Sequence, residues 1–302
     1  MMLTLLILIP FLAGVISFFI KGNGAKGLAL VSTLATLVVS GIIAVQSMGQ
    51  SQYFNMPWIP QIGTQFSLMA DGMSAVLCLL TGIVMPVIII ANWDKKVERP
   101  WSFYGLILLS QAGITGVFLA YDALLFYFFW ELALIPVYFL CSRWGGEKRI
   151  AVTFKFFVYT FVGSLMMLIG LIYLATQTPG GDGYSWANIT RAGSSLPPAT
   201  QNWIFWLIFV AFAIKIPVFP FHTWQPDTYE QSPTPVTIIL SALMVKMGMF
   251  AVIRWVLPVV PDAVTFWSNT IITLSIIGIV YASLLALRQT DLKRLIAYSS
   301  IA

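Results

Sequence analysis

Long apolar stretches separated by short polar segments run along the whole chain. Each stretch has about 20 mostly apolar residues, which is the length that an α-helix needs to cross a bilayer. None shows the alternation typical of an outer-membrane β-barrel. The pattern predicts an all-α fold, a polytopic transmembrane helix bundle with about nine spans, at residues 3–20, 28–47, 72–92, 102–120, 122–142, 151–175, 202–221, 234–257 and 267–287.

The segments between these stretches are mostly short. The two longer ones, 48–71 and 176–201, are rich in Gly, Pro, Ser and Gln, and we expect surface connections there, with a short interfacial helix near Trp186. The stretch 3–20 has no basic residue before it and no small-residue cleavage site, so it is interpreted as a retained span and not a signal peptide. Residues 291–302 begin a tenth helix of about 18 Å, too short to cross, and we expect the chain to be a fragment of a longer polypeptide.

Composition assigns the chain to the membrane proteins. Hydrophobic residues make up 59% of its 302 residues and charged residues 9%, whereas soluble domains carry about 25% charge. The net charge of +5 comes mostly from short loops, so we expect no nucleic-acid partner. Cys78 and Cys141 fall in different predicted spans and are interpreted as small buried residues. With one histidine and two cysteines, the sequence predicts no haem, iron–sulfur or zinc site, and no cofactor in this chain.

The basic residues predict the orientation. If the N-terminus is outside, the inner loops hold most of the sixteen lysines and arginines, namely Lys21, Lys26, Lys95, Lys96, Arg99, Arg143, Lys148, Arg149, Arg288, Lys293 and Arg294. The outer loops then hold Arg191 and Arg254. Because loops rich in lysine and arginine remain inside, we predict an N-terminus on the outer side.

Lys215 lies in an apolar stretch, followed by Pro217 and Pro220. A lysine at the centre of a spanning helix costs roughly 2.5–3.5 kcal/mol on insertion scales. The two prolines remove backbone donors, which is expected to free the carbonyls of Ala213 and Ile216. A broken, charged helix is tolerated only where it is buried in protein or lines a hydrated cavity. The pattern therefore indicates movement of ions or protons.

Two more charges fall within predicted spans. Glu131 lies in the middle of one, and Pro136 behind it is expected to free the carbonyl of Leu132. Lys246 lies about 17 Å from either end of its helix, too far for its stem to reach an interface easily. Lys155 is nearer the basic side and is expected to snorkel there.

Two interpretations of these charges are considered. A Glu131–Lys215 pair at about 4 Å would interact by about 4 kcal/mol at an effective dielectric near 20, enough to change whether the lysine keeps its proton. The alternative is a structural ion pair that holds helices together.

His222 follows the Lys215 helix on the predicted inner side. An unperturbed histidine titrates near neutral pH, so it could pass protons from the inner aqueous phase. A hydrogen-bonded histidine that stabilises the proline-rich loop is an equal alternative. Asp227 and Glu230 are expected to cap the next helix or to pair with inner basic residues. Asp122 precedes the Glu131 helix, where the helix dipole favours an acid.

Four motifs together resemble the antiporter-like membrane subunits of respiratory complex I, and the subunit M (chain 4) type most of all. They are Phe-Phe-Trp-Glu-Leu-x-Leu-Ile-Pro-Val-Tyr at 128–138, Lys-Ile-Pro-Val-x-Pro-x-His-x-Trp-x-Pro-Asp at 215–227, Pro-Thr-Pro-Val-x-x-Ile-Leu at 233–240 and Gln-Thr-Asp-Leu-Lys-Arg-Leu-Ile-Ala-Tyr-Ser-Ser at 289–300. Lys246 and His222 favour type M over type L.

The resemblance implies a domain organisation and a proton path. That family contains two inverted five-helix repeats. Here 1–100 would be an N-terminal three-helix segment, 101–258 the first repeat, which is a half-channel with a broken helix, and 259–302 the start of a second, truncated repeat. Glu131, Lys215 and Lys246 match the family's glutamate and its two lysines, and His222 would complete the path.

The resemblance also implies a function. The chain would be a proton-translocating subunit of an NADH–quinone oxidoreductase in a bacterial-type inner membrane. Partner subunits would bind flavin, iron–sulfur clusters, NADH and quinone, and related antiporter-like subunits would lie on either side. The alternatives are a subunit of a multi-subunit sodium/proton antiporter and a non-pumping membrane anchor.

Overall fold

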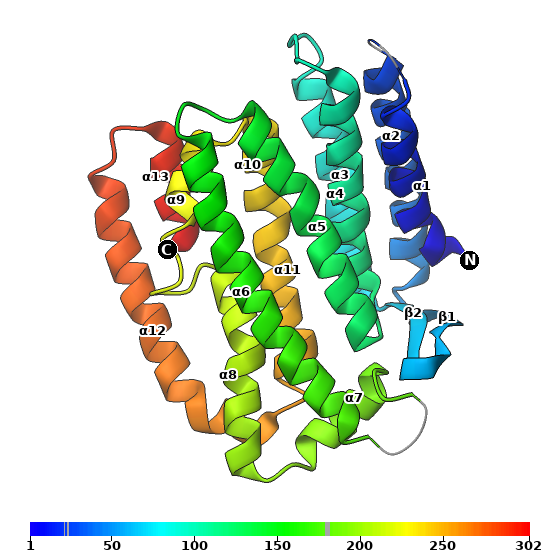
Figure 1. Cartoon of the computed structure of the whole chain (residues 1–302), viewed down its shortest axis with the longest axis vertical. Helices are drawn as coiled ribbons and strands as arrows, with labels where there is room; N and C mark the ends of the chain where they lie inside the picture. Colours follow the sequence, from blue (N-terminus) through cyan, green and yellow to red (C-terminus); the bar gives the residue numbers. More distant parts are fainter. Residues whose placement is uncertain (21, 23, 179–181) are drawn as a thin grey trace. The chain divides into compact units, whose positions relative to one another are not determined.

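The structure is a computed structural model that describes residues 1–20, 22, 24–178 and 182–302. Lys21, which the orientation prediction uses, therefore lies outside the described residues. The described chain is mostly helical (Figure 1). It forms two compact units, one of Met1–Leu140 with Thr234–Leu243 and the other of Cys141–Pro233 with Met244–Ala302.

The first unit contains α1 (Met2–Ser17), α2 (Gly24–Gln46), α3 (Gly72–Ala91), α4 (Pro100–Leu119) and most of α5 (Ala123–Trp144). α1 packs against α2 and α4, and α2 packs against α3. Glycines allow the closest approaches: a Cβ on Gly105 of α4 would lie 3.0 Å from the carbonyl oxygen of Gly14 in α1. Small residues are typical of helix interfaces in membranes, where they let the backbones meet.

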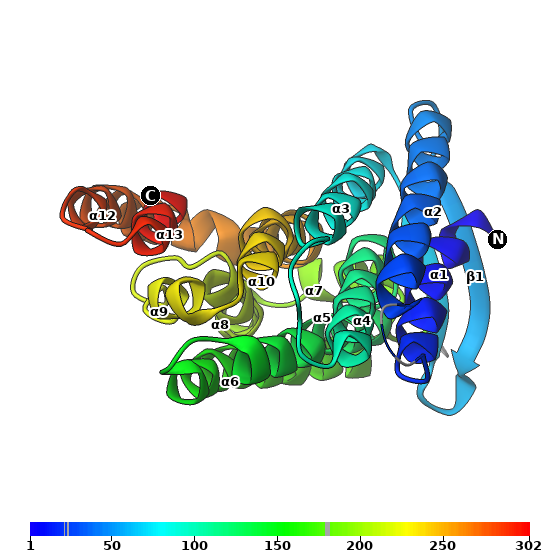
Figure 2. The same ribbon diagram turned by 90° about the horizontal axis from the view of Figure 1, so that it is seen from above.

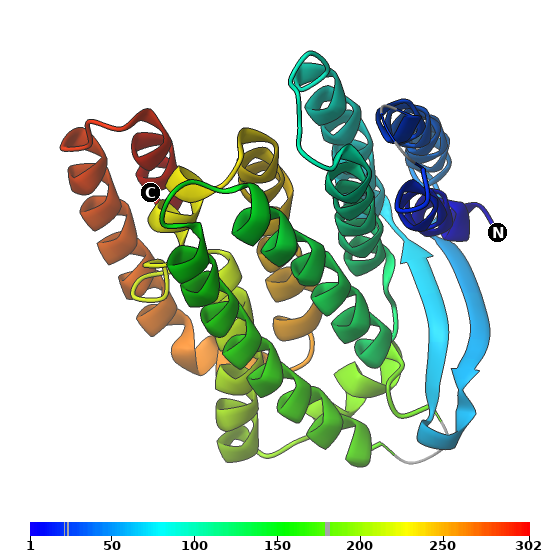
Figure 3. The ribbon, with the colours of Figure 1, turned by 45° about the horizontal axis from the view of Figure 1, so that its top comes forward.

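A β-hairpin occupies the segment that we had predicted to be an irregular connection. β1 (Gln52–Ile59) pairs antiparallel with β2 (Thr64–Ala70), and the 3₁₀ turn η1 (Pro60–Ile62) joins them (Figure 3). The turn ends at Gly63, whose φ of 71° is readily adopted by glycine. The prediction missed the hairpin because its turn residues were interpreted as a loop.

Asp122 ties this hairpin to α5. Its carboxylate accepts hydrogen bonds from Thr64 Oγ1 at 2.8 Å and from the backbone N–H of Gln65 at 3.0 Å. It also accepts bonds from the N–H groups of Leu124 and Leu125, both at 3.0 Å. Burial raises the pKa of Asp122, and these four bonds oppose that rise. Asp122 therefore lies at the start of the Glu131 helix, as expected, and its side chain also caps that helix.

The second unit contains α6 (Arg149–Thr176), α7 (Trp186–Ser194), α8 (Pro198–Lys215), α9 (Gln225–Gln231), α11 (Val245–Ala251), α12 (Pro261–Leu287) and α13 (Leu292–Ile301). α6 packs on α8, where a Cβ on Gly163 would lie 3.2 Å from Cα of Ala211. The short helix expected near Trp186 is present as α7. Figure 2 shows α9 between α6 and α13, an arrangement that positions the ion pairs described below.

The run Thr234–Val256 changes its helical type along its length. It contains α10 (Thr234–Ile238), the π-helical segment η2 (Ile239–Met244), α11 and the π-helical segment η3 (Val252–Val256). π-helical turns are rare and occur frequently at functional sites. Lys246 lies in α11, between the two π-helical segments.

Each of the nine predicted stretches contains a helix, but the number of spans stays a prediction. Among the described residues, seven helical runs are long and apolar enough to cross a membrane: α2, α3, α4, α5, α6, Thr234–Val256 and α12. α1 is apolar but has 16 residues. The predicted stretch 202–221 was too long at its end, because α8 ends at Lys215. Cys78 and Cys141 are buried free thiols, as expected.

Candidate functional site

Lys215 is the last residue of α8, and 2% of it is exposed. The backbone beyond it is hydrogen-bonded: Val218 N–H donates to the carbonyl of Ala213 at 2.8 Å, and the indole of Trp224 donates to the carbonyl of Ile214 at 2.9 Å. The predicted interruption of the helix is therefore present. The prediction that Pro217 frees the Ala213 carbonyl was wrong, because the chain turns back and Val218 supplies the missing donor.

α11 packs on the end of α8 next to this lysine. A Cβ on Gly248 would lie 2.7 Å from Cγ1 of Ile216 and 3.2 Å from both the Ile216 nitrogen and Cβ of Lys215. Only a residue without a side chain allows this approach. Lys246, two residues before Gly248, is partly buried in the same helix. The structure thus brings the helices of two intramembrane lysines into direct contact.

His222 lies in the segment between α8 and α9, and 4% of it is exposed. Its ring stacks on Phe219 with centroids 5.7 Å apart and meets Tyr281 of α12 edge-on at 5.3 Å. Nδ1 is buried and makes no hydrogen bond to the part of the chain that the structure describes. Burial lowers the pKa of His222, and the charge of Lys155 lowers it further. The ring is therefore neutral near pH 7 and keeps a nitrogen that can take a proton.

Glu131 lies in α5 and is half-buried. Pro136 falls inside this helix, which continues to Trp144. The backbone defect predicted here therefore does not interrupt the helix, unlike the break after Lys215. α4 lies very close at this level: a Cβ on Gly113 would stand 2.6 Å from Cα of Ala133.

The four predicted site residues divide between the two units. Lys215, Lys246 and His222 belong to the second unit, and Glu131 belongs to the first. The second unit brings the first three into neighbouring elements. A Glu131–Lys215 pair stays a prediction.

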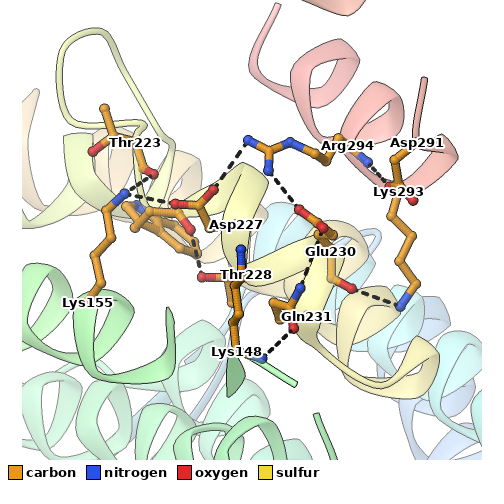
Figure 4. Close-up of polar contacts among 11 residues, drawn as sticks. Lys148, Lys155, Thr223, Asp227, Thr228, Glu230, Gln231, Asp291, Lys293 and Arg294 are labelled. Carbon is orange, nitrogen blue, oxygen red and sulfur yellow. Dashed lines mark hydrogen bonds and ion pairs between the residues drawn. The ribbon is translucent and has the colours of Figure 1, made fainter. Parts of the chain in front are cut away.

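A cluster of ion pairs lies next to His222 in the second unit (Figure 4). Lys155 Nζ contacts Asp227 Oδ2 at 2.9 Å and donates to the carbonyl of Thr223 at 2.8 Å. Arg294 contacts Glu230 at 2.7 Å and Asp227 at 3.4 Å. Both acids pair with basic residues, which confirms one of the two alternatives expected for them; the side of the membrane on which they lie stays a prediction. The ammonium of Lys155 lies between a carboxylate and a carbonyl, and its snorkelling to the interface stays a prediction.

The sequence did not single out Arg294. It appeared there only among the basic residues of the inner loops and within the motif at 289–300, with no role of its own. Contacts with partners 64 and 67 positions earlier cannot be derived from local pattern. Among the described residues, no three histidine, cysteine, aspartate or glutamate side chains gather as a metal site.

Comparison with known proteins identifies relatives of this arrangement. Residues 120–302 match the family described as "NADH:quinone oxidoreductase/Mrp antiporter, TM". The chain is 39% identical to F(420)H(2) dehydrogenase subunit M of Methanosarcina mazei, over 99% of this chain and 62% of the relative. It is 36% identical to NADH-quinone oxidoreductase subunit M of Escherichia coli, over 100% of this chain and 63% of the relative.

A solved structure shares the fold. A chain of respiratory complex I from Thermus thermophilus with bound NADH superposes with a TM-score of 0.89 at 26% identity, covering 100% of this chain and 62% of that chain. The chain thus spans about three fifths of the length of the relatives that it matches. With its family match, its membrane-length helices and its interrupted lysine helix, this multi-pass membrane chain belongs to the family of NADH:quinone oxidoreductase and Mrp antiporter membrane subunits.

Proposed function

We propose that the chain is a proton-translocating membrane subunit of an NADH–quinone oxidoreductase, of the subunit M type. Electron transfer from NADH to quinone would take place in partner subunits that hold the flavin and the iron–sulfur clusters. Related antiporter-like subunits would flank this one in the membrane. The supporting comparison is the match to NADH-quinone oxidoreductase subunit M of Escherichia coli over the whole chain.

In this proposal the chain crosses the membrane about nine times, with its N-terminus on the outer side of a bacterial-type inner membrane. Residues 1–100 form the N-terminal helices, 101–258 the first half-channel repeat and 259–302 the start of the second. The basic loops and the ion-pair cluster then face the inner aqueous phase.

The proton path begins at His222 and continues to Lys215 and Lys246. His222 is neutral near pH 7 and can accept a proton from the inner aqueous phase. Lys215 receives it at the break in α8 and passes it toward Lys246, whose helix touches that break. If Glu131 pairs with Lys215, as the sequence predicts, it would set how firmly the lysine holds its proton, since a carboxylate beside a lysine favours the ammonium form.

The observation that carries the proposal is the position of Lys215. Its amine-bearing side chain is buried at the end of an interrupted helix, against a glycine of the Lys246 helix. Intramembrane lysines are costly and mark ion or proton pathways. A broken helix next to such a charge is a poor way to stabilise a bundle.

The test replaces this lysine in the assembled complex. Lys215→Met is expected to abolish NADH-driven proton transport in proteoliposomes while the complex still assembles. Lys95→Met, which removes an exposed loop lysine, is the matched control and should transport protons normally. Full transport by Lys215→Met at equal amounts of assembled complex would reject the proton path.

The family description supports a second candidate, a subunit of a multi-subunit sodium/proton antiporter. Sodium-dependent proton exchange in vesicles without NADH would favour it. The electron donor is a separate question, because the relative at 39% identity is an F(420)H(2) dehydrogenase subunit. Co-purification with an NADH-oxidising flavin subunit would favour NADH. If neutral replacements at both Glu131 and Lys215 left assembly and transport intact, the chain would be a structural anchor.

A further inference from the structure

Three helices from distant parts of the second unit meet in the ion-pair cluster. Lys155 comes from α6, Asp227 and Glu230 from α9, and Arg294 from α13. Two positive and two negative side chains alternate, so their charges balance. The side chains are between 32% and 38% exposed, which leaves them partly screened by solvent.

Arg294 is the residue that joins both acids. Its Nη1 lies 2.7 Å from Glu230 Oε2, and its Nη2 lies 3.4 Å from Asp227 Oδ1. A planar guanidinium can contact two carboxylates through separate nitrogens, whereas a lysine ammonium is a single point charge. The first contact is close and the second is longer, and Asp227 also contacts Lys155.

The neighbouring Lys293 reaches the same short helix from α13. Its ammonium donates to the carbonyl of Ser232 at 2.8 Å and to that of Glu230 at 3.4 Å. Basic side chains commonly satisfy the last carbonyls of a helix. α13 therefore holds both the acidic side chains and the C-terminal end of α9.

α6 holds the other side of the same segment. Lys155 donates to the carbonyl of Thr223, Tyr159 Oη lies 2.8 Å from Thr223 Oγ1, and Phe156 packs on Trp224 with ring centroids 4.9 Å apart. Thr223 and Trp224 directly follow His222. The position of His222 is thus set by α6 on one side and, through α9, by α13 on the other.

We propose that Arg294 is a positioning residue of the proton path, which holds α9 through Asp227 and Glu230 and thereby keeps the segment with His222 in place against α6. The inference rests on the proposed function, because it assumes that His222 lies on the path. It gives the start of α13 a direct mechanical connection to the mouth of the path.

The experiment uses the complete membrane complex with Arg294→Gln. Backbone amides of 217–231 are expected to exchange hydrogen about fivefold faster, the change expected from losing an ion pair at the upper end of the range for partly exposed pairs. The number of protons transported per NADH oxidised should fall at equal amounts of assembled complex. Arg294→Lys keeps the positive charge but lacks the planar guanidinium that contacts both carboxylates, so it should give intermediate values in both measurements.

Arg288→Gln is the matched control. Arg288 is exposed at the end of α12 and forms no ion pair with any residue that the structure describes. This variant loses the same charge and should behave as the unmodified complex. If Arg294→Gln prevents assembly, Glu230→Gln removes the negative charge from the 2.7 Å pair while Asp227 stays paired, and it should accelerate exchange to a smaller extent.

Two results would overturn the inference. One is unchanged hydrogen exchange in Arg294→Gln, and the other is faster exchange with unchanged proton transport. Lys215→Met in the same assay separates this failure from failure of the proposed function. If Lys215→Met loses proton transport while Arg294→Gln transports protons normally, only the role of Arg294 is rejected. Normal transport in Lys215→Met would reject the path itself, and the exchange data would still decide whether Arg294 holds the segment.

Discussion

Gly248 lies so close to Lys215 that a methyl group at position 248 would stand 3.2 Å from Cβ of the lysine. The lysine therefore has a fixed place against α11, and the break in α8 depends on a helix that carries a second intramembrane lysine. The relationship leads to predictions about packing, and the surroundings of His222 and Asp122 lead to others.

Gly248→Ala should destabilise the protein and reduce proton transport. The added Cβ would lie 2.7 Å from Ile216 Cγ1, and overpacking of this kind costs about 1–3 kcal/mol. Unfolding in mixed micelles and transport in proteoliposomes measure the two effects. Gly41→Ala is the control, because a Cβ on Gly41 of α2 would meet nothing within 4 Å. If Gly248→Ala changed stability and proton transport no more than Gly41→Ala does, the close packing at position 248 would be contradicted.

Lys155→Gln should raise the pKa of His222. The positive charge of Lys155 disfavours a second positive charge on the ring. Nuclear magnetic resonance of labelled histidine in the complex can follow the titration, with the His222 signal assigned by its absence in His222→Gln. A pKa that stays the same or falls in Lys155→Gln would show that the lysine does not act on this ring.

His222 should make the protein less stable in mild acid. Its pKa is lowered in the folded state, while an unfolded histidine has a pKa of about 6.5. As the pH falls below about 6.5 the unfolded chain binds the proton more readily, so the free energy of unfolding decreases until the folded pKa is reached. Unfolding measured between neutral pH and this acid range should show that decrease, and His222→Gln should reduce it. If the free energy of unfolding fell equally steeply with pH in both proteins, His222 would not be the cause of the acid sensitivity.

Asp122→Ala should detach the β-hairpin from α5. Loss of the helix cap costs about 0.5–2 kcal/mol, and the bonds to Thr64 and Gln65 are lost as well. Protease cleavage between β1 and β2 should become faster. Asp291→Ala, which removes the cap of α13, should destabilise its own helix without exposing the hairpin. If the protease cleaved the hairpin equally fast in the two variants, Asp122 would have no specific role in holding the hairpin to α5.

The helices could be predicted because a continuous apolar run of membrane length has few other solutions. Lys215 and its prolines also identified the interruption correctly, since charge and missing donors are local properties. The end of α8 was less predictable. The turn that supplies Val218 N–H to Ala213 depends on how the following segment packs, and the sequence of the helix does not contain that information.

The hairpin and Arg294 show two different limits. Residues 52–70 contain aromatic residues on both sides of a turn that holds Pro60 and Gly63, which is a signal for two strands. The segment was still predicted to be a loop because it is rich in Gln and Ser. Arg294 gave no such signal, because pairing with Glu230 arises only when α13 folds back on α9. A Glu131–Lys215 pair likewise depends on long-range packing and stays a prediction.

The π-helical segments on either side of Lys246 affect any assignment of faces in that helix. A π-turn holds one residue more than an α-turn, and each surplus residue rotates the positions after it by about 100° around the axis. A helical wheel drawn with uniform spacing through Thr234–Val256 therefore assigns residues beyond η2 to the wrong side. Which neighbours Lys246 and Arg254 face must be taken from three-dimensional coordinates, for this chain and for any relative that has the same wide turns.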